Sequence, residues 1–332
     1  MNTQYTRRIF ILLLLAFLCF GAVVLSISTG ASKISVREII STFFSDGHTL
    51  NYQIIRNIRL PRTLVAMLAG LSLAVSGAIL QGVMRNPLAS PNIIGVSSGA
   101  GVMAVFIMIV LPDYFYLITP GAFIGAMLTT ILIYFLSWQN GIRPLRMILA
   151  GVAVSSFFSA IISGLMIFYP DRVHGVIDFM VGGLAASTWR DVEMIWPYAL
   201  GCFAVVNLLA NKLNIMLLGD ETAVSLGLRV EILRMIFIAI AALLAASSVS
   251  VVGLLGFVGL IVPHIARIIA GSDYRVLFPA SALLGMLLLT LCDTLARVVL
   301  SPADLPVGII MALLGAPFFL YLLRKGLQGH AA

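Results

Sequence analysis

The sequence predicts an all-α integral membrane protein with about ten transmembrane helices. Of its 332 residues, 61% are hydrophobic and only 10% are charged, whereas soluble domains are about 45–50% apolar and about 25% charged. The apolar runs last about 20 residues, the length of a membrane-spanning helix. Strands of a membrane barrel would instead be alternating segments of about 10 residues. No polar linker divides the chain, so we expect residues 1–332 to form one transmembrane domain.

Ten apolar segments fit this interpretation, and the eighth is unusually short. They cover residues 9–28, 62–83, 93–111, 116–137, 147–168, 192–210, 232–252, 256–270, 277–300 and 306–323.

The first apolar segment resembles an export signal because Arg7 and Arg8 precede it. However, residues 9–28 are longer than the usual signal core of about 7–15 residues, and no clear cleavage site follows. We therefore expect a first spanning helix here.

Three connecting segments are longer than tight turns. Residues 29–61 follow the first span, and residues 169–191 contain a short amphipathic helix. In residues 211–231, Asp220 and Glu221 suit a helix N-terminus and Gly227 suits its end. This last segment predicts two short helices that form a compact projection on the cytoplasmic side.

The distribution of Lys and Arg predicts that both termini are cytoplasmic. More than half of the 20 basic residues fall on that side, but Lys33, Arg37 and a cluster of Arg56, Arg59 and Arg62 fall outside. The cluster has two interpretations: anchoring to lipid headgroups, or a docking patch for an acidic partner. The net charge of +7 is explained mostly by topology, so we expect no nucleic acid partner.

The sequence contains little catalytic chemistry. It has no Walker A loop, and its four histidines are scattered, so we expect no bound cofactor and no metal site. Asp293 and Arg297 are four residues apart in the ninth span and can pair. Buried acids are otherwise scarce, which disfavours an ion-coupled secondary transporter. An intramembrane enzyme would need a polar catalytic cluster that the spans lack.

Seven stretches together resemble one family. They are R-L-P-R (59–62), S-G-A-I-L-Q-G-V-M-R-N-P-L-A-S-P (76–91), G-V-S-S-G-A (95–100), L-G-D-E-T-A-V-S-L-G-L (218–228), G-F-V-G-L-I-V-P-H-I-A-R (256–267), L-C-D-T-L-A-R (291–297) and D-L-P-V-G-I-I-M-A-L-L-G-A-P-F-F (304–319). In this order they resemble the FecCD permeases, the membrane subunits of bacterial importers for iron–siderophores, haem and vitamin B12. The chain departs from the family pattern at Asp304, Tyr274 and Phe179, where Glu, His and Trp are common.

The resemblance implies a type II ABC importer permease fold in the bacterial plasma (inner) membrane, with two permease subunits around one path. The second subunit is either another copy or a related chain. The resemblance also implies that the chain is not an enzyme: ATP and Mg²⁺ bind two separate cytoplasmic ATPase subunits. The expected cargo is a ferric siderophore, with haem or cobalamin as alternatives.

The same resemblance assigns three groups of residues. The residues expected to couple the permease to the ATPase are Leu218, Gly219, Asp220, Glu221, Ala223, Leu226 and Gly227. The residues expected to dock an extracytoplasmic substrate-binding protein are Arg59, Arg62 and Arg297. The gate facing the path is expected around Ser163, Gly164, Gly182 and Gly183.

Overall fold

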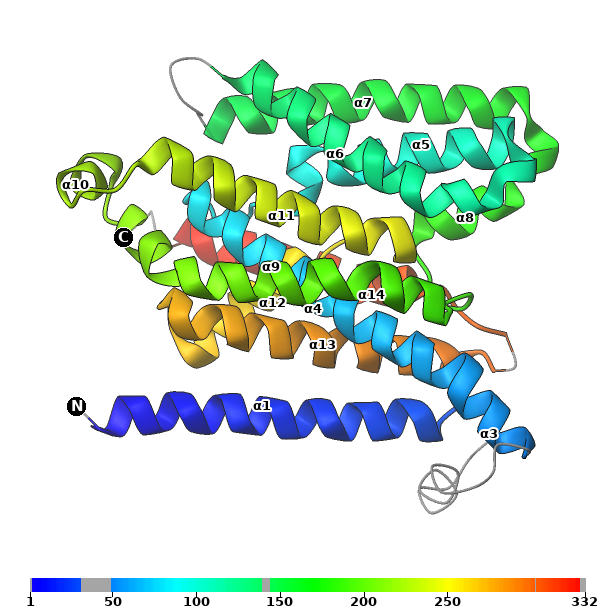
Figure 1. The fold of residues 1–332 in the computed structure, drawn as a ribbon, viewed down its shortest axis with the longest axis horizontal. Coiled ribbons are helices and arrows are strands. Elements are labelled where there is room, and N and C mark those ends of the chain that lie inside the picture. The colour runs from blue at the N-terminus through cyan, green and yellow to red at the C-terminus, as the bar shows by residue number, and fades with distance from the viewer. Residues whose placement is uncertain (1, 31–48, 139–143, 302, 329–332) are drawn as a thin grey trace.

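A computed structural model describes residues 2–30, 49–138, 144–301 and 303–328, and within them the chain is a bundle of helices without a β-strand (Figure 1). Lys33, Arg37 and most of the predicted connection 29–61 lie outside the described residues.

The helices follow one another along the chain with short connections. They are α1 (Asn2–Ser28), α3 (Leu50–Ile54), the π-helical turn η1 (Ile55–Arg59), α4 (Leu60–Val83), η2 (Pro91–Ile94), α5 (Val96–Val110), η3 (Pro112–Leu117), α6 (Ile118–Ser137), α7 (Pro144–Phe168), η4 (Pro170–Arg172), α8 (His174–Val181), α9 (Trp189–Met216), α10 (Asp220–Ser225), α11 (Val230–Val252), α12 (Val258–Ala270), α13 (Tyr274–Val299) and α14 (Val307–Gln328).

The predicted spans are confirmed as helices. Among the described residues, 7 helices are long and apolar enough to cross a membrane, and shorter apolar helices form the third, eighth and tenth spans. The short eighth span is α12, which has 13 residues.

Two spans differ most from their predicted bounds. The second begins at Leu50 instead of residue 62, because α3, η1 and α4 form one helical segment of 34 residues. Pro61 lies inside this segment but does not end it, since it directly follows the π-helical turn η1, where the helical hydrogen-bond pattern already changes. The sixth is α9, whose 28 residues give a length of about 42 Å, more than the hydrocarbon core requires.

α4 forms the centre of the bundle through close backbone contacts. A methyl group at Gly70 would overlap the carbonyl oxygen of Gly285 on α13, and one at Gly77 would overlap that of Gly259 on α12. Small residues allow such helices to pack closely. Gly99 on α5 and Gly125 on α6 pack in the same way, since a methyl group at Gly99 would overlap the carbonyl oxygen of Gly125.

The two ends of the bundle differ (Figure 1). One end carries the start of α1, the end of α14 and the small helix α10, and the opposite end carries α3 and α8. α1 and α7 lie at opposite edges, and α7 is the least buried of the long helices. The bundle therefore presents two separate end surfaces.

Candidate docking and coupling sites

The three predicted docking arginines converge at the end of the bundle that carries α3. Arg59 ends η1, Arg62 lies in the first turn of α4, and Arg297 lies in the last turn of α13. They do not form an open patch, since their exposed fractions are only 5%, 5% and 6%. Sequence reasoning identified the cluster but not its burial.

Two aspartates hold Arg62. Its Nε donates to Oδ1 and Oδ2 of Asp293 at 3.0 and 3.1 Å, and its Nη2 donates to Oδ1 at 2.9 Å. Its Nη1 donates to Oδ2 of Asp304 at 2.6 Å. Asp293 also pairs with Arg297 at 3.2 Å, as their spacing predicts. One buried carboxylate thus orients two guanidinium groups.

The other arginine contacts tie α1 to the cluster. Nη1 of Arg59 donates to the carbonyl oxygen of Ile27 at 2.6 Å. Arg297 donates to both the hydroxyl and the carbonyl oxygen of Ser26, at 2.6 and 3.1 Å. The cluster therefore joins the ends of α1, α4 and α13.

A cavity of about 260 Å³ gives access to these buried groups. Its lining consists of Gly30, Ile54, Ile58, Arg59, Arg62, Arg297 and Asp304. Because this wall carries three arginines and one aspartate, it suits a carboxylate entering from a partner. The cluster has the chemistry of a recessed acid-binding site.

The predicted gate residues separate into two groups. Ser163 and Gly164 belong to α7, where Ser163 is exposed. Gly182 and Gly183 follow α8 and form a backbone junction: the carbonyl oxygen of Gly182 accepts from the N–H of Gly308 at 3.0 Å, and the N–H of Gly183 donates to Val252 at 2.9 Å. This junction fastens α8 to α11 and α14.

Glycine is required at this junction. Gly182 has a φ of +83°, and a methyl group at Gly308 would overlap the carbonyl oxygen of Val181. Beside the junction lies a second cavity of about 340 Å³, whose lining includes Asp178, Gly183 and Asp304. The cavity at the arginines and the cavity at the junction therefore share Asp304.

At the opposite end, Asp220 fastens the predicted coupling segment to the bundle. Its Oδ1 accepts from Nη2 of Arg85 at 2.5 Å, and its Oδ2 accepts from Nη2 of Arg234 at 2.9 Å. Burial raises the pKa of Asp220, but the hydrogen bonds and charges of Arg234 and Arg85 outweigh it and hold the pKa below its ordinary value. Arg85 also donates to the carbonyl oxygen of Met216 at 2.6 Å.

Four of the remaining coupling residues form the outer surface of the projection. Leu218 and Leu226 are 63% and 59% exposed, and Glu221 and Gly227 are exposed as well. Gly219 is half-buried, and Ala223 is buried beneath the short helix. Sequence reasoning missed Val224, which is 60% exposed. Its position three residues after Glu221 places it on the same helix face.

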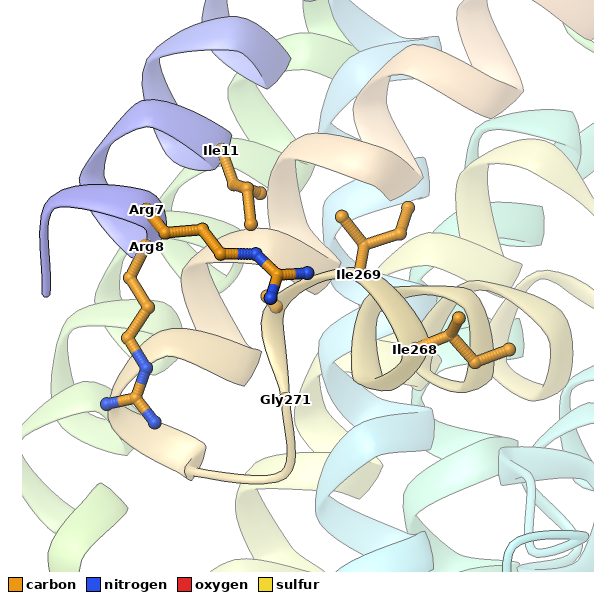
Figure 2. Close-up of a pocket in the computed structure, with 7 residues that line it drawn as sticks. Arg7, Arg8, Ile11, Ile268, Ile269 and Gly271 are labelled. Carbon is orange, nitrogen blue, oxygen red and sulfur yellow. The ribbon is translucent and has the colours of Figure 1, made fainter. Parts of the chain in front are cut away.

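A third cavity, of about 230 Å³, lies between the first turns of α1 and the end of α12. Its lining includes Arg7, Arg8, Ile11, Ile268 and Ile269. The Arg7 side chain extends toward Ile269, whereas the Arg8 side chain points away from it (Figure 2).

Asp273, just before α13, forms an ion pair with Arg8, in which Oδ2 lies 3.3 Å from Nη1. Its Oδ1 accepts a hydrogen bond from Nδ2 of Asn214 on α9 at 2.9 Å. Hydrogen bonds from Arg275 outweigh the opposing effect of burial and, with Asn214, lower the pKa of Asp273 to about 2.

No cluster of three potential metal ligands occurs within the described part of the chain. Cys19 and Cys292 are buried and Cys202 is half-buried, and all three are free thiols.

A bundle whose long helices are apolar enough to cross a membrane, with polar clusters at its two ends, defines a multi-pass membrane protein, and comparison with known proteins specifies its class. The FecCD transport family matches residues 14–325, so the chain belongs to this family. It is a permease subunit of an ABC importer; it is not an enzyme, because ATP hydrolysis takes place on separate subunits.

Two relatives illustrate the range of the family. The chain is 39% identical to the Fe(3+)-citrate import system permease protein YfmE of Bacillus subtilis (strain 168), covering 96% of both chains. It is 43% identical to the cobalamin import system permease protein BtuC of Halobacterium salinarum, over 82% of this chain and 73% of that one.

A solved structure shares the fold. This structure is an inward-facing metal-chelate type ABC transporter, with a TM-score of 0.86 and 31% sequence identity. The match covers 95% of this chain and 99% of that chain. The type II importer fold implied by the sequence motifs is thereby confirmed.

Proposed function

We propose that this permease carries a ferric siderophore or a related iron chelate into the cytoplasm. The observation that supports this cargo is the similarity, over nearly the full length, to permeases named for Fe(3+)-citrate and Fe(3+)-hydroxamate import. Cobalamin is the alternative, supported by the relative from Halobacterium salinarum. Haem remains an alternative on the family resemblance alone.

The two ends of the bundle suggest the assembly. The exposed apolar side chains of Leu218, Val224 and Leu226 suit a protein partner better than water, so we place an ATPase subunit there. In this assembly ATP and Mg²⁺ bind two such subunits, and two permease chains surround one path.

The arginine cavity is suited to the docking of the substrate-binding protein. Carboxylates on its surface would reach Arg59, Arg62 and Arg297 through the cavity. Such charge pairs increase the association rate and fix the orientation of the partner. This places the arginine end outside the plasma membrane, and α10 and both termini in the cytoplasm.

Transport then requires a change of access between the two sides. ATP binding moves the projection at α10, and the permease subunits rotate as rigid bodies. In this scheme Ser163, Gly164, Gly182 and Gly183 form the gate that faces the path.

Uptake in a strain that lacks this gene tests the cargo. We expect loss of radio-iron uptake from one or more siderophores and recovery with the wild-type gene, while haem and labelled cobalamin enter normally. Loss of cobalamin or haem uptake alone would favour that alternative, and normal uptake of all cargoes in a strain without a second such importer would contradict the proposal. Co-purification of tagged permease identifies its ATPase and binding protein.

A further inference from the structure

Only one of the two carboxylates that bind Arg62 is accessible. The side chain of Asp293 is 1% exposed, whereas that of Asp304 is 39% exposed. Asp293 occupies Nε and Nη2 of the guanidinium, and Asp304 occupies Nη1. A carboxylate entering the arginine cavity would therefore meet Arg62 at the position that Asp304 fills.

Replacing one carboxylate by another at this position conserves the interaction. Arg62 keeps its two-point contact with Asp293 and exchanges one charge-assisted hydrogen bond for another of the same kind. Asp304 loses its partner but faces open space, so its charge regains water. Neither group is left buried and unpaired, the situation that makes breaking a buried ion pair costly.

Asp304 is also attached to the gate. It lies four residues before Gly308, whose N–H donates to the carbonyl oxygen of Gly182 at 3.0 Å. Between them, the N–H of Leu305 donates to the carbonyl oxygen of Ala296 at 3.2 Å, and Pro306 has a fixed φ that stiffens the backbone.

The gate junction has little room to adjust independently. Gly308 is so close to Val181 that even a methyl group would not fit between them. Movement of residues 304–308 is therefore transmitted to the end of α8, and through the Gly183–Val252 hydrogen bond to α11.

We propose that Asp304 is an exchangeable internal partner of Arg62, which an incoming carboxylate of the binding protein displaces, and that its release shifts residues 304–308 and loosens the Gly182 junction. This inference rests on the proposed docking of a binding protein at the arginine cavity. It assigns to Asp304 a positioning role in coupling docking to the gate.

The test is Asp304→Asn in the full permease–ATPase complex, with its co-purified binding protein, in lipid nanodiscs. Asparagine competes poorly for Arg62, so the binding protein should bind about tenfold more tightly. Stimulation of ATP hydrolysis by the binding protein should nevertheless fall at least fivefold, because the exchange no longer moves the segment. Asp304→Glu should restore both values, and Asp171→Asn, an exposed carboxylate on η4, is the matched control.

Hydrogen exchange on the permease alone provides a second measurement. In Asp304→Asn, the amides of Gly183 and Gly308 should exchange at least tenfold faster than in wild type, with no change in Asp171→Asn. If Asp304→Asn weakens both binding of the binding protein and stimulation of ATP hydrolysis, Asp304 merely supports the structure and the proposal is overturned. Unchanged hydrogen exchange at the amides of Gly183 and Gly308 would also overturn it.

The two proposals fail in different ways. If the wild-type binding protein binds equally well to Arg59→Gln and wild-type permease, docking at this cavity is wrong, and the exchange mechanism is wrong with it. If docking needs Arg59 but Asp304→Asn behaves like wild type, only the exchange mechanism is wrong.

Discussion

Asp293 is the residue on which the arginine cluster depends. It is almost completely buried in α13 and contacts guanidinium groups from both α4 and its own helix. A charge in this position is stable only while it is paired, and the same holds for its partners. The pair with Arg297 could be predicted from their spacing, but not the contact with Arg62, which is 231 residues distant in the sequence.

Asp293→Ala is expected to destabilise the permease strongly. It leaves Arg62 and Arg297 without their shared buried carboxylate, and removing one member of a buried ion pair typically costs about 3–5 kcal/mol. A lower thermal unfolding midpoint in detergent, relative to Asp171→Ala as a surface control, would confirm it. An unchanged midpoint would show that the cluster contributes nothing to stability.

Arg59 allows a test of docking that preserves this ion pair. Arg62→Glu would place a third carboxylate beside Asp293 and Asp304, so a charge reversal there would confuse misfolding with lost docking. Arg59→Gln should reduce binding-protein affinity about tenfold while the ATPase still co-purifies. Arg56→Gln is the matched control, since Arg56 is exposed and lies outside the cavity. Equal affinities of the two variants would contradict docking at the cavity.

At the scale of elements, α10 illustrates what a sequence pattern can and cannot predict. Acidic residues and a terminal glycine predicted the short helix that begins at Asp220, which is confirmed. The second short helix expected in residues 211–231 is wrong, because α9 continues to Met216. The motif did not distinguish residues that face a partner from residues that hold the helix. Asp220 turns toward Arg85 and Arg234, and Ala223 is buried, whereas Val224 faces outward. These differences depend on how α10 packs on α9 and α11.

Substitutions on the two sides of α10 should therefore have different effects. Val224→Glu places a charge on the exposed apolar surface and should weaken ATPase co-purification at least tenfold. Asp220→Asn should leave assembly intact but reduce transport per ATP hydrolysed, because α10 is no longer fastened to α4 and α11. If both variants change ATPase co-purification and transport per ATP to the same extent, the two sides of α10 do not have different roles.

The attachment of α1 should depend on pH. Because the pKa of Asp273 falls from 3.8 to about 2 in the folded protein, its bonds to Arg8, Asn214 and Arg275 contribute fully above about pH 3.8 and are lost as the pH falls toward 2. The thermal midpoint should decline over this interval in wild type and less in Asp273→Asn. If the thermal midpoints of wild type and Asp273→Asn decline equally, groups other than Asp273 control stability in acid.

At the scale of the whole molecule, α4 connects the two sites. Its first turn carries Arg62, its centre packs against α12 and α13 through glycines, and Arg85, just beyond its end, holds Asp220. Hydropathy predicted the ten spans, and motifs assigned residues to both candidate sites. They could not predict that one closely packed helix joins them, because that arrangement depends on contacts between residues far apart in the sequence.

The most direct test of the account is transport by the reconstituted assembly. Permease, co-purified ATPase and binding protein are placed in proteoliposomes with a radio-iron siderophore. We predict uptake that requires both ATP and the binding protein and that Arg59→Gln reduces. Uptake driven by a proton or sodium gradient without ATP would contradict the assignment as an ABC importer permease.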